Sequence, residues 1–327
     1  MDAETVLAGY WPGVAVGSRI SPFVPEDSLS GAAFWRVTGP AGAYCLRRWP
    51  DAAAELGRVD EVHRALQHVA ARLPGVAPEP VRSAGGETVL RLASGCWELT
   101  RWVAGEADYH AAPSAEKRRS AARLLARIHR AMEGQPVPQW AGLGSPGLER
   151  RRERLRAAAA DARLPAGVRA DGVASRLSEE LQRNLSGALA SVEAALNRPL
   201  PLQWCVRDAR AEHVLFQGQE AVGLVDFGAV GIDSVAADLA RLLRGLGGSD
   251  GKAWRECLDA YGEIRPLSDA ETGAIAAYDL GGLAAAAVNW LGWQVGDRAE
   301  AQEPDAAAAR MAWLADQLAG MPPHPLD

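Results

Sequence analysis

The sequence contains very little lysine. Lys117 and Lys252 are its only two lysines, so arginine supplies almost all of the 35 basic residues. Any chemistry that needs a lysine side chain must use one of these two positions. The 41 acidic residues outnumber the basic ones and give a formal net charge of −6 at pH 7. General nucleic-acid binders carry an excess of positive charge, so we expect no nucleic-acid partner.

Cysteine is scarce as well, and the sequence lacks targeting signals. The four cysteines lie far apart and provide neither a disulfide framework nor a zinc cluster. The first residues show no basic stretch followed by an apolar one, so we expect a cytoplasmic protein. The longest weakly polar stretch, residues 274–295, contains Asp279 and Asn289, and its apolar residues recur at helical spacing. It predicts a buried helix, and no membrane partner is expected.

The remaining composition is that of a folded globular protein. Of the 327 residues, 48% are hydrophobic and 23% are charged. These fractions exclude an intrinsically disordered chain. The length corresponds to one large domain or to two ordinary ones.

The first hundred residues combine short strand-like runs with one helix. Aromatic and aliphatic runs at 33–37 and 43–49 flank a Gly-Pro-Ala-Gly cluster, which predicts a hairpin. Residues 51–72 carry apolar residues at helical spacing, and the runs at 88–92 and 97–103 predict a second strand pair. The predicted order is strand, strand, helix, strand, strand.

Helices predominate after residue 113. Ser114 is a predicted N-cap of a helix with a leucine-rich stripe, and further helices are predicted over 148–164 and 173–197. The first of these two contains a run of arginines, which we interpret as a solvated helix face: Arg150, Arg151, Arg152, Arg154 and Arg156.

Residues 200–243 depart from this helical pattern. Short apolar strands are predicted over 202–206, 214–216 and 222–225, and a Gln-Gly-Gln turn joins the last two. Asp208 follows the first strand and Asp226 follows the third, with His213 between them in the sequence. A hairpin of this kind places both carboxylates on loops at one edge of a small sheet.

Asp226-Phe227-Gly228 directly after a strand, with Asp208 on a loop upstream, resembles the catalytic core of the protein-kinase fold. The longer pattern, D-x4-H, V-L-F, a turn, G-L-V-D-F-G and then Asp233 and Asp238, is similar to that of the aminoglycoside phosphotransferase and choline kinase group of small-molecule kinases. The resemblance spans nearly the whole chain. It implies an α+β, two-lobed, protein-kinase-like fold with a small antiparallel-sheet lobe over residues 1–97, a hinge over 98–105 and a mostly helical lobe over 106–327.

The same resemblance implies an ATP- and Mg²⁺-dependent phosphotransferase that acts on a hydroxyl group of a small molecule. Asp208 would accept the proton of the attacking hydroxyl, Asp226 would hold Mg²⁺, and His213 occupies the position of the second metal ligand. The implied nucleotide contacts are Ser30 and Gly31 in a loop over the phosphates, Arg47 at the phosphate-binding position of the third strand, and the backbone of Glu98 and Thr100 at the adenine. Of Glu55 and Glu61, we prefer Glu55 as the partner of Arg47, because helical spacing places it on the apolar face of its helix and Glu61 away from it.

Three positions depart from the pattern of the group. Arg47 replaces the usual lysine, and the planar guanidinium group is not equivalent to a compact ammonium group. Val206 and Arg207 stand where a histidine and a glycine are usual. His213 replaces an asparagine, although Mg²⁺ prefers oxygen ligands.

These departures leave two functions open. The first is an active small-molecule kinase, and the second is a pseudokinase that binds a nucleotide or metabolite with little or no transfer. A protein kinase is disfavoured because the H-R-D-L-x-x-x-N and A-P-E segments are missing. The acceptor stays open among aminoglycosides, amino sugars, choline, homoserine and methylthioribose, since a fold does not specify a substrate.

Overall fold

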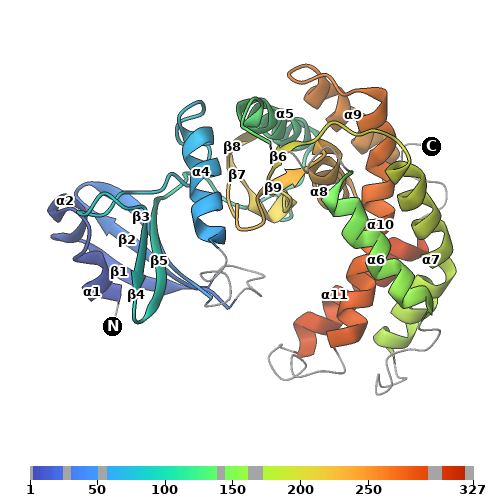
Figure 1. Cartoon of the computed structure of the whole chain (residues 1–327), viewed down its shortest axis with the longest axis horizontal. Helices are drawn as coiled ribbons and strands as arrows, with labels where there is room; N and C mark the ends of the chain where they lie inside the picture. The colour runs from blue at the N-terminus through green and yellow to red at the C-terminus, as the bar shows by residue number, and fades with distance from the viewer. Residues whose placement is uncertain are drawn as a thin grey trace.

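The computed structural model describes residues 3–24, 31–50, 57–137, 144–160, 172–293 and 304–320. An antiparallel sheet with small helices lies at one end of the molecule, and a mostly helical part lies at the other (Figure 1). Helix α4 lies between the two (Figure 1). The predicted α+β fold, with a small antiparallel sheet and a mostly helical remainder, is confirmed.

The N-terminal part is built on one five-stranded sheet with the strand order β1-β2-β3-β5-β4. All of its neighbouring strands pair antiparallel. Both predicted strand pairs are confirmed, as β2 with β3 and as β4 with β5. The elements of this part are α1 (Ala3–Leu7), α2 (Pro12–Ala15), β1 (Arg19–Phe23), β2 (Ala33–Gly39), β3 (Gly42–Trp49), α4 (Arg58–Ala70), β4 (Val89–Leu92) and β5 (Gly95–Arg101).

Two buried clusters cover the two faces of this sheet region. Val37, Leu46 and Leu99 lie on the central strands β2, β3 and β5. All three are fully buried, together with residues of α1. The apolar stripe of α4 is buried in the larger cluster, which continues into the helical part. The spacing of that stripe predicted the helix, but α4 begins only at Arg58, after Gly57 at φ +63°. Residues 51–56 lie outside the described residues.

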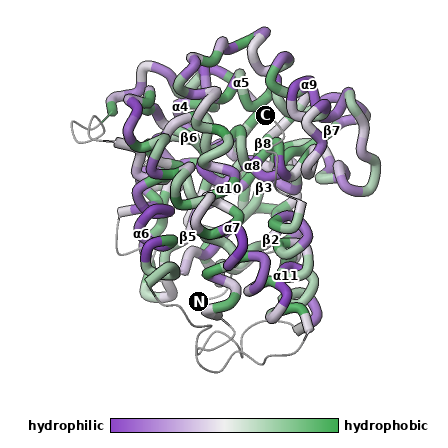
Figure 2. The backbone as a smooth tube through the Cα atoms, turned by 90° about the vertical axis from the view of Figure 1, so that its right-hand side faces the viewer, coloured by the Kyte–Doolittle hydropathy of each residue, from purple (hydrophilic) through white to green (hydrophobic). Residues whose placement is uncertain are grey.

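The C-terminal part consists of helices around two small two-stranded sheets, β6 with β9 and β7 with β8. Its helices α6, α7 and α11 face the viewer in Figure 2, where α6 shows hydrophilic turns. The elements are α5 (Ala115–Met132), α6 (Pro146–Ala160), α7 (Val173–Leu196), β6 (Gln203–Cys205), η2 (Ala211–His213), β7 (Val214–Gln217), β8 (Glu220–Leu224), β9 (Gly231–Asp233), α8 (Val235–Gly247), α9 (Gly251–Gly262), α10 (Asp269–Trp293) and α11 (Pro304–Ala319).

Helix α10 is the helix predicted over 274–295, and it begins earlier, at Asp269. By length and composition it could cross a membrane, but 67% of its most apolar stretch is buried inside the structure. It contacts α6, α7, α8 and α11. These contacts are those of a central core helix of a folded protein.

Candidate active site

The β7–β8 hairpin and the loops beside it bring three predicted site residues together. Asp208 lies between β6 and η2, His213 ends η2, and Asp226 follows β8. One ligand atom from each side chain lies within 4.8 Å of those of the other two. Asp226 is the most open of the three, with 46% of its side chain exposed, against 13% for His213.

The backbone at this site adopts a rarely populated conformation. Among the described residues other than glycine, only Arg207 and Asp226 have positive φ angles, of 64° and 59°. Such a conformation costs on the order of 1–3 kcal/mol and is retained where the surroundings hold it in place. The positive φ of Arg207 also explains why glycine is usual at this position in the group that the sequence resembles.

A buried carboxylate supports the strained loop. Asp238, on α8, accepts hydrogen bonds from the backbone N–H groups of Val206 at 2.8 Å and Arg207 at 2.6 Å. Nε2 of His129 lies 3.0 Å from the same carboxylate, and Nδ1 of His129 lies 2.8 Å from the hydroxyl of Tyr261. Both His129 and Asp238 are fully buried. Together they fix the backbone at the start of the loop that carries Asp208.

Two arginines hold Asp208 in its charged form. Its Oδ1 lies 2.6 Å from Nε of Arg241 and 3.5 Å from Nε of Arg210. Burial raises the pKa of this carboxyl, but the charges of Arg241 and Arg210 outweigh burial and keep the pKa below its usual value. Asp208 is therefore a carboxylate across the physiological pH range, placed to accept a hydrogen bond.

The contacts of His213 define which of its nitrogens is free to bind a metal. Its Nδ1 lies 2.9 Å from the backbone carbonyl oxygen of Asp208, and because a carbonyl only accepts, Nδ1 carries the proton. Nε2 then has a lone pair, and it lies 3.9 Å from Oδ2 of Asp226. The carboxylate of Asp226 and this imidazole nitrogen form a donor pair that fits a divalent cation.

Arg47 lies beside this site, at the end of the sheet that faces it. The guanidinium group of Arg47 stacks 3.7 Å from the ring centroid of Trp49 and reaches Glu98, with Nη1 at 3.8 Å from Oε1. A side-chain carbon added at Gly228 would lie 3.7 Å from Nη2 of Arg47. The guanidinium group of Arg47 therefore lies next to the segment that carries Asp226.

The partner of Arg47 in the structure is Glu98. Arg47 and Glu98 are paired across β3 and β5, so their side chains share one face of the sheet. The other carboxylate oxygen of Glu98 lies 2.5 Å from Nε2 of His63, on α4. Helix α4 thus contributes a histidine to this cluster, and a strand contributes the carboxylate. Glu55, the predicted partner, lies outside the described residues, as does Ser30.

The predicted hinge, residues 98–105, begins inside a strand of the structure. Glu98 and Thr100 lie inside β5, which continues to Arg101, and Glu98 pairs with β3 on one side and β4 on the other. The adenine contacts of Glu98 and Thr100 stay a prediction. The connecting segment starts at Trp102. Gly31, predicted in the phosphate loop, lies just before β2 at φ +68°.

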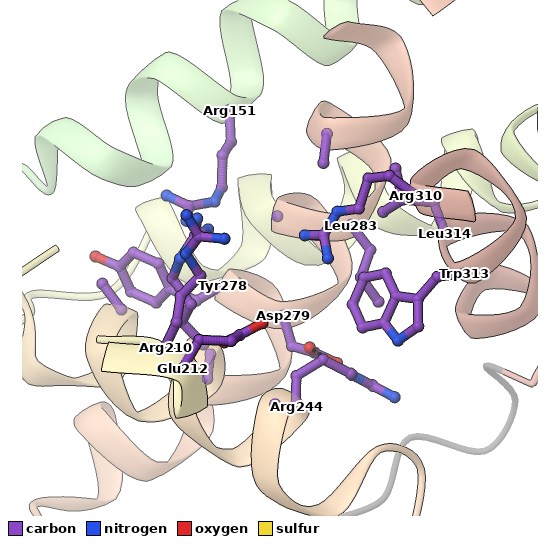
Figure 3. Close-up of a pocket in the computed structure, with 16 residues that line it drawn as sticks. Arg151, Arg210, Glu212, Arg244, Tyr278, Asp279, Leu283, Arg310, Trp313 and Leu314 are labelled. Carbon is purple, nitrogen blue, oxygen red and sulfur yellow. Dashed lines mark hydrogen bonds and ion pairs between the residues drawn. The ribbon is translucent and has the colours of Figure 1, made fainter. Parts of the chain in front are cut away.

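A pocket lined with arginines opens beside Asp208 and was missed by the sequence analysis. Arg210 and Arg241, which hold Asp208, also line this pocket, together with Arg151 from α6 and Arg310 from α11 (Figure 3). The interpretation of the α6 arginines as a solvated face is wrong for Arg151. A usable signal was present, because Arg151 lies three residues after Leu148 and four before Leu155, both fully buried.

Comparison with known proteins identifies the family. The sequence profile described as the phosphotransferase enzyme family matches residues 25–278. The chain belongs to this family. The resemblance to small-molecule phosphotransferases of the aminoglycoside phosphotransferase group is thereby confirmed.

Individual phosphotransferases resemble the chain over most of its length. A homoserine kinase of Methylobacterium radiotolerans is 26% identical over 279 residues, which cover 84% of this chain and 80% of that protein. An aminoglycoside phosphotransferase from Alicyclobacillus acidocaldarius superposes with a TM-score of 0.65 at 18% identity, covering 98% of this chain and 93% of the other. An amicoumacin kinase in complex with AMP-PNP, Ca²⁺ and Ami gives a TM-score of 0.67 at 14% identity, with coverage of 100% and 96%. At these identities the structural matches establish the fold.

Proposed function

We propose that this phosphotransferase transfers the γ-phosphoryl group of ATP to a hydroxyl of a small molecule, with the help of a divalent cation. The observation that carries the proposal is the convergence of Asp208, His213 and Asp226 beside an arginine-lined pocket. The relatives named above support the same reaction type, since they are kinases of small molecules.

Asp208 orients the acceptor in this proposal. In the reaction, the acceptor oxygen forms a bond to the γ-phosphorus, the bond from that phosphorus to the bridging oxygen of ADP breaks, and the hydroxyl proton leaves toward Asp208. A carboxylate with a lowered pKa is a weak base, so its main contribution is to hold the hydroxyl in line.

The other site residues hold the nucleotide. Asp226 and His213 are the residues that would bind the cation, and a bound Mg²⁺ would neutralise charge on the phosphates. Arg47, braced by Glu98, faces the same segment and would contact phosphate oxygens through a planar fork of donors. The nucleotide then lies between the sheet and the hairpin, and residues 1–97 and 106–327 act as two lobes joined through the connecting segment.

The experiment is a coupled assay of ADP release with a panel of small alcohols, run on the wild type and on Asp208→Asn. We expect the variant to lose turnover by about 10²- to 10⁴-fold while its nucleotide affinity changes only a few-fold, because the substitution keeps the shape and removes the charge. Asp226→Asn should instead abolish the divalent dependence of nucleotide binding. Transfer by the Asp208 variant at the wild-type rate would refute the assignment.

The alternative of a pseudokinase is decided by the same measurements. If the wild type and Asp208→Asn bind nucleotide equally well, and the wild type transfers phosphate to no acceptor, the protein is a nucleotide-binding module. We propose that the reaction takes place in the cytoplasm, in keeping with four cysteines that form no disulfide.

A further inference from the structure

The lining of the pocket beside Asp208 has a strong excess of positive charge. Five arginines and two carboxylates contribute to it: Arg151, Arg210, Arg241, Arg244, Arg310, Glu212 and Asp279. Arg244 is neutralised by Asp279, with Nε donating to Oδ1 at 3.0 Å. Arg210 and Arg241 share the single carboxylate of Asp208. The lining therefore carries more positive than negative groups, in a chain whose net charge is −6.

Arg151 contributes most directly to this excess. Among the described residues no carboxylate oxygen lies within ion-pair distance of its guanidinium group, whose Nη1 donates to the carbonyl oxygen of Gly147 at 2.9 Å. The group lies 5.0 Å from the ring centroid of Tyr278, so one side packs on an aromatic face. Burial lowers the pKa of Arg151 from its usual value. A half-buried arginine that forms no ion pair with a carboxylate of the described residues is stabilised when an anion binds beside it.

We infer that the acceptor is an alcohol bearing an anionic group, a carboxylate or a phosphate, bound by Arg151 and the arginines around it. The inference rests on the proposed function, because it assigns the pocket to the acceptor of that reaction. Figure 3 shows Arg151, Arg210 and Arg310 pointing into the pocket from α6, the loop after Asp208 and α11. An arginine fork binds either anion through two parallel hydrogen bonds.

The position and size of the pocket agree with this assignment. Arg210 and Arg241 contact Asp208 and line the pocket, so an anion held there would leave the rest of the molecule within reach of the carboxylate that orients the hydroxyl. The cavity measures about 80 Å³, and one water-sized group needs about 10–15 Å³ of such space. A compact metabolite fits this space, and the positive lining opposes a polycation such as an aminoglycoside.

A matched series of alcohols tests the inference. The compounds share a hydroxypropyl chain and differ at the far end: 4-hydroxybutyrate carries a carboxylate, hydroxypropyl phosphate a phosphate, aminopropanol an ammonium group and butanol a methyl group. We expect calorimetric binding and, in the presence of ATP and Mg²⁺, transfer only for the two anionic compounds. A comparison of 4-hydroxybutyrate with hydroxypropyl phosphate then shows which of the two anionic groups the pocket binds.

Arg151→Met and Arg156→Met form a variant and its matched control. Both residues lie on α6, but Arg156 is exposed and pairs with Glu193 at 2.6 Å, away from the pocket. Arg151→Met should weaken binding of the better anionic alcohol by about 10- to 100-fold, the value of a hydrogen bond to a charged group. Its nucleotide affinity should stay at the wild-type level, and Arg156→Met should change neither affinity.

The outcomes separate this inference from the proposed function. Preferential binding or phosphorylation of aminopropanol or butanol overturns the anionic acceptor and leaves the kinase assignment intact. Nucleotide binding without transfer to any alcohol overturns the kinase assignment, and calorimetry with the four alcohols still tests the charge preference of the pocket. If Arg151→Met does not fold, as judged by thermal unfolding, the wild-type series alone decides the question.

Discussion

At the scale of single residues, His213 is the departure from the family pattern that has the clearest chemical consequence. The hydrogen bond of its Nδ1 to the Asp208 carbonyl aims the lone pair of Nε2 at the metal position. An amide at this position would present an oxygen, which Mg²⁺ prefers, whereas an imidazole nitrogen suits later divalent metals better. If the proposed cation site is correct, the identity of residue 213 would determine its metal preference.

His213→Asn should shift the metal preference toward Mg²⁺. We expect the ratio of Co²⁺ to Mg²⁺ affinity, measured calorimetrically with a nucleotide present, to fall on the order of tenfold. The visible absorption of bound Co²⁺ should change at the same time, because it reports nitrogen ligation. His68→Asn, on α4, is the control and should leave both readouts unchanged. An unaltered Co²⁺ spectrum in His213→Asn would show that the imidazole is not a ligand.

At the scale of elements, the segment between β5 and α5 depends on a close approach of two backbones. Glu106 and Phe216 exchange backbone hydrogen bonds of 2.9 Å, which tie this segment to the β7–β8 hairpin. Gly105 lies directly before this bridge at φ +109°, and an added Cβ would lie 3.0 Å from the Phe216 carbonyl oxygen. Glycine is required here for both conformation and space.

Gly105→Ala should destabilise the fold and disturb the β7–β8 hairpin, which lies between the two proposed metal ligands. We expect a loss of about 1–3 kcal/mol in the free energy of unfolding, measured by urea titration. Gly218→Ala is the matched control, since Gly218 has φ +61° but no atom within 4 Å of an added Cβ. Gly218→Ala carries only the conformational penalty. If it lowers the free energy of unfolding as much as Gly105→Ala does, the close approach of the two backbones does not have the proposed role.

At the scale of the whole molecule, the cluster of Arg47, Glu98 and His63 joins the sheet to α4 next to the site. Burial raises the pKa of Glu98, but the hydrogen bond from His63 and the charge of Arg47 outweigh it and lower the pKa below its usual value of 4.5. Arg58, at the start of α4, donates to the carbonyl oxygen of Gly228 at 2.8 Å. The sheet, α4 and the loop after β8 are thus linked through charged groups.

Glu98→Gln should make stability less dependent on pH in the acid range. Because the folded-state pKa is lowered, ionised Glu98 stabilises the fold above about pH 4, and this contribution is lost as the pH falls through the folded pKa. The variant should be about 1–3 kcal/mol less stable at neutral pH, with the deficit shrinking in acid. Glu79→Gln, from an exposed pair with Arg101, should cost less than about 1 kcal/mol. A deficit independent of pH would contradict the assignment.

The sequence by itself determined the parts of this protein that depend on local pattern. Strands β2 to β8 and helices α4, α5, α6, α7 and α10 follow from hydrophobic periodicity, whereas β1, β9, α9 and α11 were not predicted. The convergence of Asp208, His213 and Asp226 follows from one hairpin whose turn is readable in the chain. These residues lie close in sequence, so the local conformation alone brings them together.

Only the tertiary structure decided which distant side chains meet. The pairing of Arg47 with Glu98 depends on the register of β3 against β5, and a strand pattern does not fix which residues of two strands face each other. The inward direction of Arg151 depends on where α6 packs against α7 and α10, although its spacing from two buried leucines was visible. The charge of the pocket beside Asp208 arises from arginines on separate elements, and only packing places them around one cavity.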